Sequence, residues 1–111
     1  GKTFSSFILS PNTHPEKVRR EIVSSKHTIV FDEMLECAGK TYTIIKTKKG
    51  ESTLDDMQLT FGAFYKYSDN FEHFAKKELR SLENILAKNP EAQLQGKIDL
   101  IKSALGDRIQ E

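Results

Sequence analysis

A run of apolar residues at helical spacing, from Phe71 to Leu86, constrains the fold more than any other feature of the sequence. The apolar positions recur at intervals of three and four residues, which is the spacing of one helix face. They are Phe71, Phe74, Ala75, Leu79, Leu82, Ile85 and Leu86. Ser68-Asp69-Asn70 is typical of a helix start, and Asn89-Pro90 ends the helix because proline cannot continue its hydrogen-bond ladder.

A second apolar stripe follows the proline. It consists of Leu94, Ile98, Ile101 and Leu105, and it extends to Ile109. An amphipathic helix is stable only when its apolar stripe is buried, and two such helices joined by a short turn can bury each other. The sequence therefore predicts an αα-hairpin over this part of the chain.

The first part of the chain reads as a strand followed by a helix. Residues 3–9 are rich in aromatic and β-branched side chains and precede a Ser-Pro-Asn turn. Thr13 and Glu16 have the spacing of a capping box, with Pro15 in the first turn. The sequence predicts a helix of about 10 to 12 residues here, ending near Ser24-Ser25, because apolar residues recur at helical spacing.

Between residues 27 and 49 the apolar spacing changes to that of strands. Two β-prone segments flank Ala38-Gly39-Lys40, which predicts a hairpin, since Gly39 can adopt a positive φ. Glu33 interrupts the alternation and allows a bulge there. A short helix from Glu33 to Ala38 is the alternative. Apolar and polar residues also alternate over 58–66, which predicts a further strand.

These elements give the order β-α-β-β-β-α-α. The sequence thus predicts a single α+β domain over residues 1–111, with a mainly antiparallel sheet of about four strands covered by helices. The first two strands can pair in parallel through a right-handed crossover. Because the chain starts with Gly1-Lys2, we expect a domain excised from a longer protein.

The charge of the chain is balanced, with 17 basic and 16 acidic residues and a formal net charge of +1. A dedicated polyanion-binding domain is usually far more basic. The single cysteine, Cys37, excludes an internal disulfide and predicts a reducing, cytoplasmic location. No apolar run is long enough for a membrane helix.

Motifs for catalysis are weak or absent from the sequence. The three histidines lack metal-ligand spacing. Cys37 reads as a small core residue rather than a nucleophile. No glycine-rich phosphate loop occurs, so we expect no cofactor. A cluster of charged residues in the hairpin could hold a divalent cation for phosphodiester hydrolysis, although a solvated strand face is the simpler interpretation. The cluster comprises Asp32, Glu33, Glu36 and Lys40.

Basic residues near aromatic ones give the candidate binding site. Lys46 and Lys48 share one strand face, and the next predicted strand brings Phe64 and Tyr67 nearby, a combination that can contact phosphates and stack bases. The full candidate set is Lys17, Arg19, Arg20, Lys46, Lys48, Lys49, Phe64 and Tyr67.

The sequence favours a non-catalytic interaction domain that recognises another protein through a sheet edge or the helical hairpin. The first alternative is a nucleic-acid-binding module that uses the lysine-rich strand. The second is a fragment of a metal-dependent enzyme or nuclease.

Overall fold

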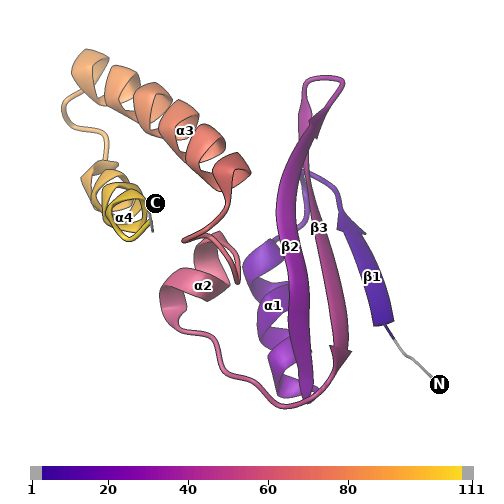
Figure 1. Cartoon of the computed structure of the whole chain (residues 1–111). Coiled ribbons are helices and arrows are strands. Elements are labelled where there is room, and N and C mark those ends of the chain that lie inside the picture. The colour runs from indigo at the N-terminus through magenta and orange to yellow at the C-terminus, as the bar shows by residue number, and fades with distance from the viewer. Residues whose placement is uncertain (1–3, 109–111) are drawn as a thin grey trace. The chain divides into compact units, whose positions relative to one another are not determined.

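The computed structural model describes residues 4–108. The chain divides into two compact units, and the boundary falls between Phe64 and Tyr65. The elements of the first unit are β1 (Phe4–Leu9), α1 (Pro15–Ser24), β2 (His27–Cys37), β3 (Lys40–Lys49) and α2 (Asp56–Phe61). Those of the second are α3 (Asp69–Lys88) and α4 (Gln95–Gly106), as Figure 1 shows. The predicted α+β class is confirmed.

The sheet has three strands in the order β1-β3-β2, and both pairings are antiparallel. Ile45 of β3 pairs with Phe7 of β1 on one side and with Asp32 of β2 on the other. The predicted parallel pairing of the first two strands is wrong. β3 lies between them. The short turn at 38–39 places β3 directly beside β2, and β1 pairs with the other edge of β3.

The hairpin turn was predicted correctly. Ala38 and Gly39 both have positive φ, 53° and 78°, which is the geometry of a two-residue turn that follows the twist of its strands. β2 continues to Cys37, so the alternative helix from Glu33 to Ala38 is wrong. The irregularity in β2 lies between Ile29 and Phe31 rather than at Glu33.

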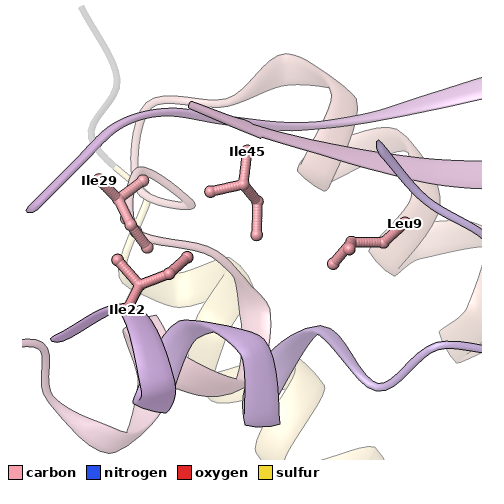
Figure 2. Close-up of a cluster of buried hydrophobic side chains, with 5 residues drawn as sticks. Leu9, Ile22, Ile29 and Ile45 are labelled. Atoms are coloured by element: carbon pink, nitrogen blue, oxygen red, sulfur yellow. The ribbon is translucent and has the colours of Figure 1, made fainter. Parts of the chain in front are cut away.

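The core of the first unit lies between the sheet and α1. Figure 2 shows Ile22 of α1 pointing toward Ile29, Ile45 and Leu9 of the three strands. Ala63 completes this buried cluster, and the side chain of Ile45 is fully buried. Because side chains alternate along a strand, the residues next to Leu9, Ile29 and Ile45 on their strands point to the opposite face of the sheet.

The strand predicted over 58–66 does not form. Residues 56–61 are α2, and a capping box fixes its start: Asp55 accepts a hydrogen bond from the backbone N–H of Gln58 at 2.8 Å, and the Gln58 side chain accepts one from the Asp55 N–H at 3.0 Å. Gly62, with φ of 130°, ends the helix. The capping box therefore outweighs the apolar alternation, and the segment forms a helix instead of a strand. The sheet has three strands among the described residues, not four.

The predicted capping box at α1 is also wrong. The helix begins at Pro15 with His14 as its N-cap, and no side chain caps it. Thr13 instead closes a turn, since its backbone N–H donates to the Ser10 carbonyl at 3.0 Å. The predicted helix and its end near Ser24 are otherwise confirmed.

The predicted αα-hairpin is confirmed as the second unit. The buried residues Phe71, Ala75 and Leu82 of α3 and Ile98 and Ile101 of α4 supply its apolar seam. The predicted positions Thr3 and Ile109 lie outside the described residues. Hydrogen bonds join the segment just before α3 to the segment just after α4. The Tyr65 hydroxyl donates a hydrogen bond to Asp107 at 2.8 Å, and Arg108 donates one to the Ser68 carbonyl.

Truncation of Ile45 should destabilise the first unit. We expect Ile45→Ala to lower the free energy of unfolding by about 2–5 kcal/mol, because a fully buried side chain leaves a cavity. Leu35→Ala, at an exposed position of the same hairpin, should change it by less than about 0.5 kcal/mol. Urea denaturation followed by circular dichroism measures both, and equal losses would contradict the packing described.

Candidate functional site

A buried ion pair is the best organised polar group of the first unit. Arg19 of α1 donates from Nε to Asp32 Oδ2 at 2.8 Å and from Nη2 to Oδ1 at 3.1 Å. Both side chains are almost completely buried. The paired, parallel hydrogen bonds hold the planar guanidinium against the carboxylate in one orientation.

The same pair also holds the segment that ends the first unit. Arg19 Nη1 donates to the Leu59 carbonyl at 2.8 Å, and Asp32 Oδ2 accepts from the Ala63 backbone N–H at 3.0 Å. Gly62 lies close to both side chains, and a Cβ there would meet Arg19 Nη2 and Asp32 Oδ1 at 3.7 Å. The ion pair therefore links α1, β2 and the end of α2. Arg19 and Asp32 were predicted to belong to different surface groups, so their contact was not predicted from the sequence.

The predicted basic residues do not form one patch. Arg19 is only 2% exposed and is directed inside the unit. Lys17 and Arg20 are exposed on α1, which covers one face of the sheet, and Arg20 pairs with Glu16 at 3.1 Å. Lys46 and Lys48 alternate with the buried Ile45 and Thr47 and so lie on the opposite face of the sheet.

The predicted aromatic partners of these lysines lie elsewhere. Phe64 and Tyr67 follow α2 in irregular chain, and the unit boundary falls between them. The aromatic ring beside Lys46 is that of Phe31, with Nζ 5.2 Å from its centroid, an arrangement that favours the cation. Lys49 ends β3 opposite His27 and is exposed. Ligand binding by these residues stays a prediction.

The acidic cluster of the hairpin does not assemble. Asp32 and Glu33 are neighbours on β2 and point to opposite faces, with Asp32 buried against Arg19. Among residues 4–108, no three histidine, cysteine or acidic side chains come together as a metal site. Cys37 is exposed at the hairpin end rather than in the core, because the tip of the hairpin extends past α1 (Figure 1).

The sheet face opposite α1 exposes large apolar side chains on both outer strands, on either side of Lys46 and Lys48 of β3. Along β1, Phe4 and Ile8 lie on this face and are 59% and 72% exposed. Phe31 and Leu35 of β2 lie on the same face and are also exposed.

The two edges of this sheet differ in protection. β2 carries the carboxylates of Glu33 and Glu36 and a register irregularity, features that disfavour pairing with a further strand. β1 carries no charged residue, and within residues 4–108 its outer edge has no strand partner. A groove of about 500 Å³ also lies beside β1 on the α1 side, lined by Phe7, Leu9, Val18, Glu21 and Ile22 among others. An unpaired edge, two largely exposed apolar side chains and this groove thus lie together at β1.

The solved structures similar to this chain include tRNA methyltransferases. Streptococcus pneumoniae Sp1610, assigned as a tRNA (m1A22) methyltransferase, is 31% identical with a TM-score of 0.70, and the match covers 90% of this chain and 49% of that one. TrmK of M. capricolum, solved with S-adenosylhomocysteine, is 21% identical with a TM-score of 0.75, covering 95% and 50%. TrmK of B. subtilis is 18% identical with a TM-score of 0.65, covering 91% and 51%.

A family model identifies the group. The model for TrmK, tRNA (adenine(22)-N(1))-methyltransferase, matches residues 2–111, so the chain belongs to this family. The chain spans about half the length of the solved structures that it resembles. Among curated proteins no match to it is found.

The predicted non-catalytic domain that recognises a protein is wrong, because the family is one of enzymes that modify tRNA. A protein as the main partner is not supported, whereas the predicted alternative of a nucleic-acid partner agrees with the family. Among residues 4–108, no helix has the length and apolar character that crossing a membrane requires.

Removal of Arg19 should destabilise the first unit strongly. We expect Arg19→Met to cost about 3–5 kcal/mol of unfolding free energy, because Asp32 would remain buried without its partner. Arg20→Met, which breaks an exposed pair on the same helix, should cost at most about 1 kcal/mol. Thermal unfolding followed by circular dichroism compares them.

A double variant separates the charge from the packing. Arg19→Met with Asp32→Leu should recover part of the loss, since no unpaired charge stays buried. A single Arg19→Met variant as stable as Arg20→Met would show that the buried pair does not hold the unit together.

Proposed function

We propose that this chain is part of an enzyme that transfers a methyl group from S-adenosylmethionine to N1 of an adenine in tRNA. The match of residues 2–111 to the TrmK family model carries the proposal. The similarity to the Streptococcus pneumoniae protein, which was also solved with S-adenosylmethionine, supports it. Because the chain spans about half of these relatives, the proposal concerns the complete protein.

The described residues do not fit a binding site for the methyl donor. Cofactor sites between a strand and a helix commonly use a glycine-rich loop that allows close backbone approach. The β1–α1 connection, residues 10–14, contains no glycine, and the β3–α2 connection, residues 50–55, contains only Gly50. The glycines with positive φ serve instead in the hairpin turn, after β3 and at the end of α2. We assign no step of methyl transfer to residues of this chain.

The first unit instead provides the surface on which the rest of the enzyme is built. β1 has an uncharged outer edge, large exposed side chains on one face and an apolar groove on the other. A further strand beside β1 would satisfy its free backbone groups, and covering elements would bury Phe4 and Ile8. The length of the relatives beyond this chain is sufficient to supply both.

Methyl transfer is tested with the complete protein that contains this chain. Tritiated S-adenosylmethionine and an unmodified tRNA transcript with adenine at position 22 should give incorporation of label. The matched substrate carries guanine at that position and should stay unlabelled. Absence of label in the adenine transcript, or equal label in both, would overturn the proposed activity.

Truncation at β1 tests whether the rest of the enzyme covers it. In the complete protein, Ile8→Ala should lower the unfolding free energy by about 2–5 kcal/mol, as for a buried side chain, although Ile8 is largely exposed in the described unit. Val30→Ala, on the protected edge strand β2, should cost less than about 0.5 kcal/mol. A small effect of both substitutions in urea denaturation would contradict the assignment of β1 as the joining strand.

A further inference from the structure

The chain is anchored on both sides of the boundary between the two units. The first unit ends at Phe64, and the second begins at Tyr65. Ala63 belongs to the buried core of the first unit, and Tyr65 is only 2% exposed. Phe64, between them, is 38% exposed. The chain therefore passes from one unit to the next through a single residue whose side chain reaches solvent.

The anchor on the first unit holds both backbone groups of Ala63. Its N–H donates to Asp32 Oδ2 at 3.0 Å, and its carbonyl accepts from the Gln58 side chain at 3.2 Å. Asp32 is itself held by Arg19, and Gln58 is held by the capping box with Asp55. Ala63 therefore stays with α1, β2 and α2 unless these hydrogen bonds break.

The anchor on the second unit begins one residue after Phe64. The Tyr65 hydroxyl donates to Asp107 at 2.8 Å, and the Tyr65 ring packs edge-on against Phe71, with the ring centroids 5.6 Å apart. The Ser68 N–H donates to the Tyr65 carbonyl at 3.4 Å. These contacts join the start of the helical unit to its first helix and to the segment after its last helix. Tyr65 therefore moves with the helical unit.

The torsions of Phe64 are the main freedom left between the two anchors. Peptide planes are rigid, so a change of direction between Ala63 and Tyr65 has to come from the φ and ψ angles between those planes. Within residues 4–108, Phe64 forms no hydrogen bond or ion pair that such a rotation would break. Hinges are commonly a few positions at the ends of elements or in loops that absorb a change in φ and ψ.

We propose that Phe64 is a one-residue hinge about which the helical unit turns relative to the first unit. Each unit keeps its own hydrogen bonds during the turn, because the anchors lie on either side of the hinge. Units of one chain change their relative orientation by default unless a large apolar interface prevents it. Motions of this kind open and close many enzymes during turnover. The hinge goes beyond the proposed activity, and its test requires no methyl transfer.

Pulsed EPR distance measurements in the complete protein test the hinge. One spin label is attached to the exposed Cys37 of the first unit and one to Ser81→Cys of α3, after any cysteine outside this chain is replaced by serine. Phe64→Gly should broaden the distance distribution by at least about 1.5-fold, because glycine has access to more backbone conformations. Tyr67→Gly is the matched control, since it also replaces an exposed aromatic residue but lies beyond the second anchor. It should leave the wild-type width unchanged.

A second pair of variants tests the anchor at Tyr65. Tyr65→Phe keeps the ring that packs on Phe71 and removes only the hydroxyl that donates to Asp107. It should broaden the distribution by a smaller factor than Phe64→Gly, because rotation is then no longer confined to one residue. Tyr42→Phe removes a hydroxyl from β3 and should have no effect. An unchanged width in Tyr65→Phe would contradict the second anchor and, with it, the one-residue hinge.

Labels within the helical unit check that the variants fold. With Cys37→Ser, labels at Ser81→Cys and Ser103→Cys report on α3 and α4 alone. They should give the wild-type distance in every variant, because the hinge lies outside this pair.

The distributions distinguish the hinge from two other arrangements. Wild-type width in Phe64→Gly would show that the units are held together by something other than Phe64 and would overturn the proposal. Equal broadening by Phe64→Gly and Tyr67→Gly would show a longer flexible connection and would overturn it as well. Broadening confined to Phe64→Gly and Tyr65→Phe would support the hinge whether or not the complete enzyme methylates tRNA.

Discussion

The buried ion pair of Arg19 and Asp32 is the interaction on which the first unit depends. Its two side chains come from α1 and β2, and their remaining hydrogen-bonding atoms hold backbone groups at the end of α2. Desolvating two charges is expensive, and the cost is offset only when the geometry satisfies most of their donors and acceptors. The pair therefore fixes one arrangement of α1, β2 and α2. It also holds the backbone in place as far as Ala63, just before the unit boundary.

The sheet of this unit is protected on one side and open on the other. Carboxylates and an irregular register disfavour a new strand beside β2, while β1 has neither feature and carries Ile8 on an uncovered face. An uncharged edge strand can pair with another strand, because its outward backbone N–H and C=O groups have no partner in the sheet. The asymmetry has a simple physical cause if β1 lies inside a larger sheet in the complete enzyme.

Local patterns predicted the elements that are stabilised locally. The helical spacing from Phe71 to Leu86 and the turn at Gly39 were sufficient for the αα-hairpin and the β-hairpin. The strand expected over 58–66 failed because Asp55 and Gln58 form a capping box that the alternation concealed. The Arg19 contact joins residues 13 positions apart on different elements, and no spacing in the sequence indicates it. The family was missed because no motif identified in the sequence indicated a methyltransferase.

The balanced net charge conceals a separation of charges in the helical unit. In the net charge, Glu78 and Lys77 simply cancel. In the structure, Glu78 is paired with Lys97 across the hairpin, whereas the neighbouring Lys77 is exposed to solvent. A helical projection of residues 69–88 would have revealed a line of basic residues, Lys77, Arg80 and Lys88, from the sequence alone. Only the structure shows that every carboxylate of this helix is already engaged. A surface potential depends on which charges remain unpaired on a face, and so a chain of formal charge +1 can still present a locally basic surface.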